Sequence, residues 1–273
     1  MRDAQSLAGT NPDTLSGANL HSATIGEAES WMLRNVQPDQ GTAQPSTYDL
    51  NRDRLETYFD STAQKAWIDL TSDAPVSGVR ATVRAGREAM RNTLLGWLPE
   101  DLAGARVLDA GCGTGAFSIA AAARGAHVTG IDIAGGLVDV ANRRMPEIDG
   151  PGRIEWRAGD MLDPALGSFD HVVAMDSLIH YRQEDLVASL ARLGERTAHS
   201  ILFTFVPRTP LLFAMYQAGK LFPRSDRSPR LVPIAESHLK WSLVSLKNWR
   251  VARSHRVSRG FYTSHAIELV RRG

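Results

Sequence analysis

The sequence has one cysteine among its 273 residues and no long hydrophobic run. A single cysteine excludes a disulfide framework and a thiolate metal cluster within one chain, which favours a reducing compartment. A transmembrane helix needs about 18 consecutive apolar residues, and no stretch reaches that length. The N-terminus also lacks the basic segment and apolar run of a secretory signal. We therefore predict a cytoplasmic protein without a transmembrane helix, while peripheral contact with a membrane stays open.

An excess of charge of one sign is missing as well. Lys and Arg together number 31, Asp and Glu together number 30, and the formal net charge is +1. This balance creates no global field toward nucleic acid, so we expect no nucleic-acid partner. The hydrophobic content of 43% and the charged content of 22% are ordinary for a soluble globular protein and supply a core.

The N-terminal part of the chain is poor in large apolar residues. Residues 1–50 are rich in Gly, Ser, Thr, Asn, Asp, Gln and Pro, which predicts a flexible extension with at most a short helix over 27–36. From Leu55 to Leu98 two apolar stripes at helical spacing flank turn residues at 71–77. We predict a helical N-terminal arm over 51–100.

Strands and helices alternate from Arg106 onward, which predicts a parallel sheet covered on both faces. The expected strands are 106–110, 127–132, 153–158, 170–175 and 200–206, and the expected helices are 116–124, 135–144 and 184–197. Two last strands, 249–258 and 261–270, meet at Gly260 and predict a hairpin. The predicted fold class is therefore α/β, with a Rossmann-like sheet of seven strands that is mostly parallel and ends in an antiparallel hairpin.

The segment after Pro207 interrupts this alternation. An apolar helix is expected over 211–221, a basic loop with prolines over 223–233, and a further helix over 235–246. We interpret 208–234 as an inserted, lid-like segment within a domain that spans 51–273.

The strongest motif is Val107-Leu108-Asp109-Ala110-Gly111-Cys112-Gly113-Thr114-Gly115, an apolar strand that leads into a glycine-rich turn. Glycines let the backbone approach a ligand closely, and Gly111, Gly113 and Ala116 also match the dinucleotide pattern. Asp109, however, would repel a pyrophosphate and suits a cationic amino-acid ligand, and Gly115 adds a third glycine. The run resembles motif I of the class I methyltransferases. Cys112 lies within the turn and is interpreted as a small residue that fits there, because the sequence places no base beside it.

Acids also end the following strands, at the sheet edge that faces the ligand crevice of an open α/β fold. Asp132, about 20 residues after Gly111, is expected to accept hydrogen bonds from ribose hydroxyls, with Ile133 beside it. Asp160 resembles the family residue that meets the adenine amino group, with Met161 backing the ring, although a helix N-cap would explain Asp160 nearly as well. The remaining candidates follow the fourth strand near the transferred methyl group, and they are Asp176, His180 and Tyr181.

Beyond the glycine turn, several segments resemble the magnesium-protoporphyrin IX methyltransferases of chlorophyll and bacteriochlorophyll synthesis, and among these the bacteriochlorophyll branch. The segments are Tyr58-Phe59-Asp60-Ser61-Thr62 with Trp67, Val83-Arg84-Ala85-Gly86-Arg87, Met175 to Tyr181, Gly219 to Pro229, and Arg259-Gly260-Phe261-Tyr262. The resemblance covers roughly residues 55–271.

The resemblance implies transfer of a methyl group from S-adenosylmethionine to one propionate of magnesium protoporphyrin IX. A carboxylate is already ionised at pH 7, so no general base is needed. In the family, a histidine at the position of His180 and a tyrosine of the arm are candidate active-site residues. His180 would aim the propionate or reach the magnesium, and we favour the first because magnesium prefers oxygen ligands. Thr71 stands where a second family tyrosine aligns, which leaves Tyr58 as the nearest phenol.

A second propionate implies a basic contact. Arg84 and Arg87 could supply it, or else Lys220, Arg224, Arg227 and Arg230. Each of them could instead be a solvated surface charge. Tyr181 is a further substrate-binding candidate. The segment 211–230 could cover the flat substrate or rest on an anionic membrane. Because this substrate is poorly soluble and is made by magnesium chelatase, the resemblance also implies direct transfer from the large subunit of that enzyme.

Three alternatives stay open. The first is a class I methyltransferase of another small acid, phenol or quinone, which would share every cofactor residue. The second is a non-catalytic nucleotide-binding protein on the same fold. The third is an NAD-dependent oxidoreductase, which Asp109 disfavours.

Overall fold

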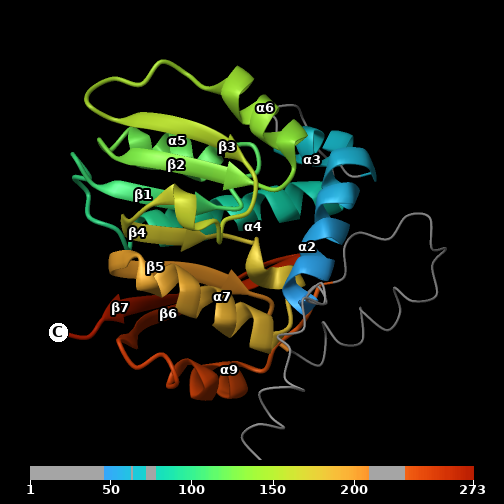
Figure 1. Cartoon of the computed structure of the whole chain (residues 1–273). Coiled ribbons are helices and arrows are strands. Elements are labelled where there is room, and N and C mark those ends of the chain that lie inside the picture. The colour runs from blue at the N-terminus through green and yellow to red at the C-terminus, as the bar shows by residue number, and fades with distance from the viewer. Residues whose placement is uncertain (1–45, 63, 72–77, 209–230) are drawn as a thin grey trace, which may run out of the picture. The chain divides into compact units, whose positions relative to one another are not determined.

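The computed structural model describes residues 46–62, 64–71, 78–208 and 231–273. These residues contain a seven-stranded sheet in the order β3-β2-β1-β4-β5-β7-β6. The strands are β1 (Arg106–Ala110), β2 (His127–Asp132), β3 (Arg153–Ala158), β4 (Phe169–Ala174), β5 (Thr197–Phe205), β6 (Trp249–Arg259) and β7 (Tyr262–Arg271). Strands β1 to β5 pair in parallel, and β7 pairs antiparallel with β5 and β6 (Figure 1). The expected mostly parallel sheet with an antiparallel C-terminal hairpin is confirmed.

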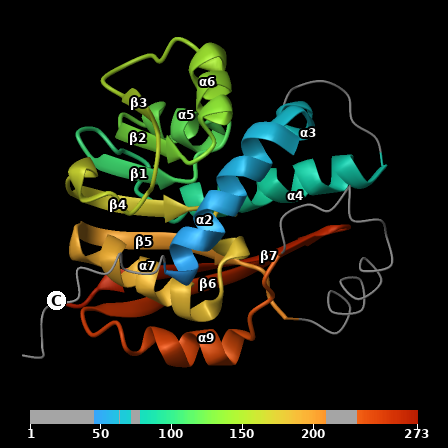
Figure 2. The same ribbon diagram turned by 45° about the vertical axis from the view of Figure 1, so that its right-hand side comes forward.

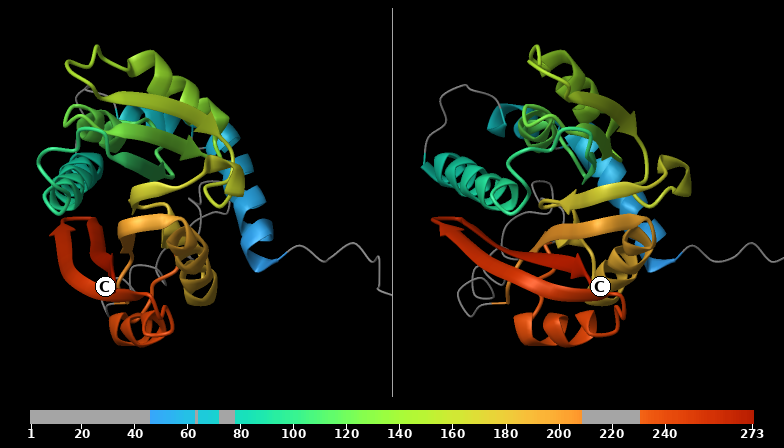
Figure 3. Two further views of the ribbon diagram at one scale, coloured as in Figure 1. Left: turned by 60° about the vertical axis from the view of Figure 1, so that its left-hand side comes forward. Right: turned by 90° about the vertical axis from the view of Figure 1, so that its left-hand side faces the viewer.

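The central strands are buried on both faces, which explains their nearly continuous apolar sequence. On one face, Val107 and Val173 pack with α4 (Gly78–Leu95) and α5 (Ala116–Ala122). On the other face, Leu108 and Val172 pack with α7 (Gln183–Glu195) and α9 (Glu236–Leu243). Figure 3 shows α4 and α7 on opposite sides of the sheet. A further helix, α6 (Gly135–Arg144), packs on β2 and β3.

The observed boundaries differ from the expected ones mainly at the ends. β1, β2, β3 and α6 have the expected limits, whereas β4 starts one residue earlier and β5 three residues earlier. α5 ends two residues early at Ala122, because the chain turns through Ala123 and Arg124 toward β2. Two 3₁₀ turns, η2 (Pro164–Leu166) and η3 (Leu178–His180), follow β3 and β4.

Within its described residues, the N-terminal arm contains α2 (Thr47–Thr57), the π-helical η1 (Tyr58–Thr62), α3 (Gln64–Leu70) and α4. α2 begins within the range 1–50, with Ser46 and Asp49 forming a capping box. Its bonds to the rest of the chain are distant in sequence, since Tyr48 Oη donates to Asp160 and Asn51 Nδ2 donates to the His180 carbonyl. α2 therefore crosses the carboxyl ends of the strands (Figure 2).

The two ends of the inserted segment meet at the same sheet edge. Pro207 and Ile234 form a parallel bridge, and the amide of Val232 donates to the carbonyl of Ile179 at 2.9 Å. The expected helices over 27–36 and 211–221 and the basic loop up to residue 230 lie outside the described residues. Among the residues that are described, no helix combines the length and the apolar character needed to cross a bilayer.

Candidate active site

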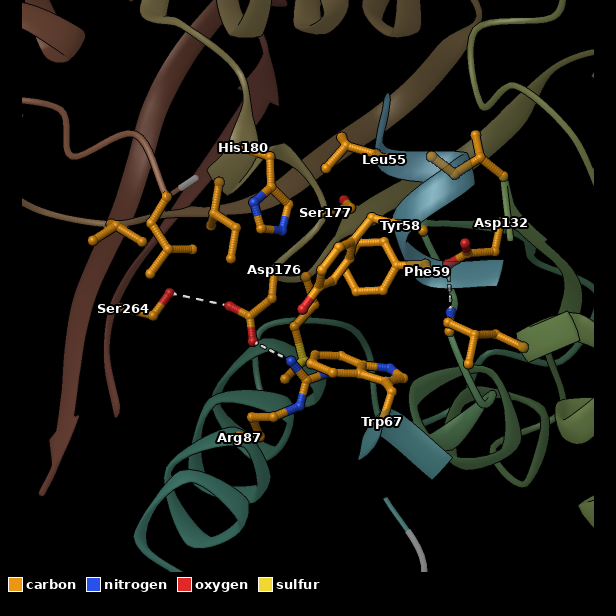
Figure 4. Close-up of a pocket in the computed structure, with 18 of the residues that line it drawn as sticks. Leu55, Tyr58, Phe59, Trp67, Arg87, Asp132, Asp176, Ser177, His180 and Ser264 are labelled. Atoms are coloured by element: carbon orange, nitrogen blue, oxygen red, sulfur yellow. Dashed lines mark hydrogen bonds and ion pairs between the residues drawn. The ribbon is translucent and has the colours of Figure 1, made fainter. Parts of the chain in front are cut away.

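A cavity of about 490 Å³ opens at the carboxyl ends of β1, β2 and β4. Its volume lies in the range of pockets that bind small molecules. β1 and β4 are neighbours in the sheet, and the chain leaves them in opposite directions, so the cavity lies at the switch point where α/β sheets bind ligands. The arm and β7 complete its wall, with residues from Tyr48 to Ser264. Figure 4 shows part of this lining, including Tyr58 and Trp67 from the arm and Ser264 from β7.

The glycine turn forms one wall of this cavity, and its amides are already engaged. The amides of Gly111 and Cys112 both donate to the Ile131 carbonyl, at 2.8 and 3.0 Å. The amide of Gly113 donates to Asp132 Oδ2 at 2.8 Å. A pyrophosphate-binding turn would point these donors at the ligand. The turn can therefore approach a ligand closely but offers few amides to a phosphate.

The three glycines are required by backbone conformation and by packing. Gly111, Gly113 and Gly115 have φ values of +85°, +54° and +85°. A Cβ on Gly111 would lie 2.3 Å from Ser177 Cβ, and one on Gly115 would lie 2.4 Å from Trp156 Cη2. Gly111 and Gly113 line the cavity, whereas Gly115 packs behind it against the Trp156 indole.

Asp132 lies in the cavity wall with unused hydrogen-bonding capacity. Its carboxylate accepts from the amides of Gly113 and Ala134, at 2.8 and 2.9 Å. A carboxylate has about four lone-pair positions, so about two remain for ligand hydroxyls. Burial raises the pKa of Asp132, while these two amides oppose the shift. The apolar side chains of Ile133 and Met161 line the same part of the cavity.

Two other candidates of the motif face away from the cavity. Asp109 is 1% exposed and accepts a hydrogen bond from Ser118 Oγ at 2.6 Å. Burial raises the pKa of Asp109 to about 7. The Cys112 side chain is also buried, and burial raises the pKa of its thiol. Neither residue is among the described residues that line the cavity.

Asp160 attaches α2 to the sheet. Its carboxylate accepts from Tyr48 Oη at 2.7 Å, from Arg52 Nη1 at 3.1 Å and from the Leu162 amide at 2.8 Å. The last bond is a local turn that resembles the expected N-cap, although no α-helix follows. Asp160 itself does not line the cavity, whereas Tyr48 and Met161 do.

Asp176 lies in the cavity wall, two residues after the end of β4, with a φ of +54°. Four side chains donate to its carboxylate. Arg87 Nη1 lies 2.7 Å from Oδ2, Tyr262 Oη lies 3.1 Å from both oxygens, and Thr204 and Ser264 approach Oδ1 at 3.1 and 3.3 Å. The donors come from α4, β5 and β7, so this acid joins three elements.

His180 and Tyr58, the two candidate catalytic residues, both line the cavity. The Phe59 ring lies between them and makes edge contacts with Tyr58 at 5.3 Å and His180 at 5.9 Å. Phe59 also contacts Trp67 at 5.8 Å. Burial raises the pKa of the Tyr58 phenol, so this hydroxyl stays protonated at neutral pH.

Some of the substrate-binding candidates line the cavity and others do not. Arg87 lines the cavity, with its guanidinium carbon 4.6 Å from the centre of the Trp67 ring. Arg84 Nε instead donates to the Leu70 carbonyl at 3.0 Å, and its Nη2 donates to the Asp69 carbonyl, so it caps the C-terminus of α3. Tyr181 lines the cavity but is 3% exposed and stacks on Tyr48 at 4.9 Å. Lys220 and Arg224 lie outside the described residues.

Some residues of the site were not identified as site residues from the sequence. Ser177 follows Asp176 and lines the cavity, and its buried hydroxyl has no hydrogen-bond partner within the described part of the chain. Tyr262 belongs to a segment that supports the family resemblance, but no local pattern places it beside Asp176. Trp67 is part of an apolar stripe, and only the structure brings it under Arg87.

Comparison with known proteins agrees with this geometry. A family model described as "Magnesium-protoporphyrin IX methyltransferase C-terminus" matches residues 174–271, and one described as "Methyltransferase domain" matches residues 107–198. A crystal structure of magnesium protoporphyrin IX methyltransferase from Synechocystis with bound S-adenosylhomocysteine has a TM-score of 0.72 and 29% identity. It covers 81% of this chain and 100% of that chain.

Two curated relatives extend the likeness over most of the sequence. The magnesium-protoporphyrin O-methyltransferase of Synechocystis is 31% identical over 219 residues, which are 80% of this chain and 95% of the relative. The magnesium-protoporphyrin O-methyltransferase of Rhodobacter capsulatus is 48% identical over 229 residues, which are 82% of this chain and 98% of the relative. The chain therefore belongs to the magnesium-protoporphyrin O-methyltransferase family and has the class I methyltransferase fold.

Proposed function

We propose that this protein transfers a methyl group from S-adenosylmethionine to a propionate carboxylate of magnesium protoporphyrin IX, giving the monomethyl ester and S-adenosylhomocysteine. The observation that carries this proposal is one cavity that joins two kinds of wall. The turn of Gly111 and Gly113 with Asp132 lies on one side, and His180 with Arg87 lies on the other. The names and the high identity of the relatives support the choice of acceptor.

The first wall fits a sulfonium nucleoside better than a dinucleotide. Asp132 retains lone pairs for ribose hydroxyls, and Ile133 and Met161 offer apolar surface to a purine ring. The buried Ser177 hydroxyl, which lacks a described partner, is available to a polar group of the ligand. Because the amides of the turn donate within the chain, a pyrophosphate would find few donors there. When bound, S-adenosylmethionine supplies an electrophilic methyl group.

The second wall needs to position a nucleophile rather than to create one. A propionate is ionised at neutral pH, so the residues act by aligning its oxygen with the methyl group. We assign this aiming to His180, whose backbone is fixed by the bond from Asn51 to its carbonyl at 2.9 Å. Phe59 and Tyr58 keep the surroundings apolar, which favours a step in which opposite charges neutralise.

The second propionate requires a cation, and we assign it to Arg87. Arg84 is bonded to the end of α3, whereas Arg87 lines the cavity. The guanidinium of Arg87 lies over the Trp67 ring, a geometry that suits a cation held at a fixed position. Lys220 and Arg224, outside the described residues, stay predictions for the same role.

The test combines a binding and a turnover measurement on the whole chain. Absorbance titration with magnesium protoporphyrin IX should give binding at micromolar concentration, and labelled S-adenosylmethionine should give labelled monomethyl ester. A phenol or quinol acceptor serves as the comparison. Methylation of the comparison acceptor without porphyrin binding would favour a different acceptor class. Absence of any methyl transfer, despite binding of S-adenosylhomocysteine, would favour a non-catalytic protein.

The assignment of His180 has its own variant pair. We expect His180→Ala to lower kcat by about 10-fold or more, because an unaimed carboxylate samples fewer reactive orientations. Binding of S-adenosylhomocysteine, measured by calorimetry, should stay within about 2-fold, since Asp132 and the glycine turn are untouched. His238→Ala, on the exposed face of α9, is the matched control. Equal turnover in both variants would remove His180 from the mechanism.

We further propose that the mouth of the cavity meets a membrane surface or a donor enzyme. Phe261 and Leu231 line the cavity and are 56% and 41% exposed. Such exposed apolar side chains at an entrance suit a poorly soluble macrocycle. Flotation with vesicles of anionic or zwitterionic lipid tests the first partner, and Phe261→Ser should reduce any binding. Co-purification with the large subunit of magnesium chelatase tests the second, and its absence would argue for a freely diffusing substrate.

A further inference from the structure

The Asp176 carboxylate is saturated by the protein itself. Its Oδ1 accepts hydrogen bonds from Thr204, Tyr262 and Ser264, and its Oδ2 accepts hydrogen bonds from Arg87 and Tyr262. These contacts use all of the roughly four lone-pair positions of a carboxylate. The side chain is 4% exposed. Although Asp176 is placed in the cavity wall, it has no capacity left for a hydrogen bond from a ligand, which differs from the cofactor-binding role expected from its position in the sequence.

The backbone around Asp176 is built to hold this arrangement. Its φ of +54° lies in the left-handed region, which costs an L residue roughly 1 kcal/mol. Its amide donates to Thr204 Oγ1 at 2.8 Å, and the same hydroxyl donates back to Oδ1. A strained conformation persists when the surrounding structure over-determines it, and such positions cluster at functional sites.

The cation in this cluster is held on two sides. Arg87 Nη1 bonds to Asp176, and the guanidinium stacks over Trp67 at 4.6 Å. Among the described residues, no acceptor other than Asp176 contacts Arg87. The side chain is 23% exposed and lines the cavity, so its remaining N–H groups are available there. Figure 4 shows Arg87 between Asp176 and the Trp67 ring. A guanidinium fixed in this way loses little entropy when it binds a second anion.

We propose that Asp176 is a positioning residue for the acceptor, not a ligand of the methyl donor. Held by Thr204, Tyr262 and Ser264, it fixes Arg87 so that the free side of the guanidinium receives the carboxylate that is not methylated. The proposal rests on the proposed function, because it assumes an acceptor with two carboxylates. This arrangement would make the enzyme selective for porphyrins with two carboxylates over those of the same ring with one.

The test measures that selectivity directly. Two acceptors are compared, magnesium protoporphyrin IX and a magnesium porphyrin that carries a single propionate. We expect the wild type to prefer the di-acid by about 10-fold or more in kcat/KM, the effect of one hydrogen-bonded charge pair. Asp176→Asn should reduce this preference to within about 3-fold. The loss should appear in KM for the di-acid, while kcat for the mono-acid and the affinity for S-adenosylhomocysteine change by less than about 2-fold.

Further variants separate positioning from general damage. Asn tolerates a left-handed backbone well, so Asp176→Asn keeps the turn. Tyr262→Phe retains the ring that packs on Gly86 and removes one donor, and it should lower the di-acid preference by a smaller factor. Arg87→Gln should abolish the preference, and adding Asp176→Asn to it should change nothing more. Glu268→Gln is the matched control, because Glu268 is a buried acid at another position of β7, where it pairs with Arg253 of β6. This variant should leave the di-acid preference unchanged.

Each outcome decides between assignments. A preference that survives in Asp176→Asn and in Tyr262→Phe would overturn the proposal even if stability falls. If Asp176→Asn instead lost affinity for S-adenosylhomocysteine and kept the di-acid preference, Asp176 would be assigned to the binding site of the methyl donor. If Asp176→Asn does not fold, Tyr262→Phe and Arg87→Gln carry the same comparison. If the wild type binds neither porphyrin, the proposed function fails, whereas failure of the variants alone removes only the role of Asp176.

Discussion

The four acids at the ends of the strands show how a similar position leads to different roles. Asp132 faces the cavity with spare lone pairs, whereas Asp176 is saturated by four side chains. Asp160 binds the arm, and Asp109 is buried behind the glycine turn beside Ser118. The sequence places all of them at one edge of the sheet, but the direction of each side chain depends on which donors pack against it. Only the first of them is placed to accept hydrogen bonds from a ligand.

Burial of Asp109 predicts an unusual dependence of stability on pH. Its pKa is raised from 3.8 to about 7 in the folded state, so between these values the native protein binds more protons than the unfolded chain. Stability should therefore fall as pH rises from about 4 to about 7, by on the order of 4 kcal/mol in total. Asp109→Asn should flatten this dependence and exceed the wild type in stability at pH 8. Urea unfolding at pH 5, 6.5 and 8 measures both, and parallel curves for the two proteins would contradict the assignment.

Substituting Gly113, which lines the cavity, should weaken ligand binding in addition to straining the backbone. Gly113 and Gly104 both have positive φ, at +54° and +77°, so alanine at either position costs roughly 1 kcal/mol. Only Gly113 lines the cavity, where a Cβ would point toward Trp67 Nε1 at 3.3 Å. We expect Gly113→Ala to weaken binding of S-adenosylhomocysteine by about 10-fold or more, and Gly104→Ala to leave it unchanged. Calorimetry on both variants checks this, and equal affinities would show that the turn does not contact the ligand.

The helices and strands differ in how far local sequence predicts them. β1, β2 and β3 have the expected limits because each is a short segment with β-branched or other apolar residues, set between turn residues. The predicted helical arm from residue 51 includes most of α2 but misses its start at Thr47, because Thr47–Thr57 is largely polar and its stabilising partners lie more than 100 residues away at Asp160 and His180. Periodicity cannot report a helix whose main contacts are distant hydrogen bonds.

The docking of α2 predicts a local effect that can be measured. Tyr48→Phe keeps the stacking on Tyr181 but removes the bond from Tyr48 Oη to the Asp160 carboxylate. A bond to a charged acceptor contributes about 1.5–3 kcal/mol, and Arg52 still binds Asp160, so we expect the lower end of that range. Hydrogen exchange should accelerate in 47–57 and stay unchanged in β5. Thr47→Ala, which removes an exposed bond to Asp185, is the control and should have little effect.

At the scale of the whole molecule, the site is an assembly that no single segment reveals. Arg84 and Arg87 lie one turn apart on α4, yet one caps α3 and the other lines the cavity. Their spacing gives no reason to choose between them, because the difference comes from Trp67 and Asp176, which belong to other elements. The glycine turn, Asp132 and His180 could be predicted because strand ends meet at one edge. The family resemblance also indicated Tyr58 and Arg87 of the arm, whereas Tyr48 and Trp67 of the arm and Tyr262 of β7 were not predicted as site residues.

Because residues from Tyr48 to Ser264 line one cavity, a ligand that fills it binds only the folded arrangement of arm, sheet and hairpin. Binding to the native state alone stabilises by about 2.7 kcal/mol at a concentration of 100 Kd. For a domain of this size we expect S-adenosylhomocysteine to raise Tm by about 5–10 °C. NADH should not, because the amides at Gly111, Cys112 and Gly113 already donate to Ile131 and Asp132.

Differential scanning fluorimetry with both ligands makes this comparison on one sample. Gly113→Ala should shrink the shift caused by S-adenosylhomocysteine, because the variant has the same fold and a weaker site. Stabilisation by NADH with no response to S-adenosylhomocysteine would mean that the turn rearranges to release its amides. The hydrogen bonds of these amides would then be a property of the ligand-free turn only. They could no longer be used to argue that the site prefers a sulfonium nucleoside to a dinucleotide.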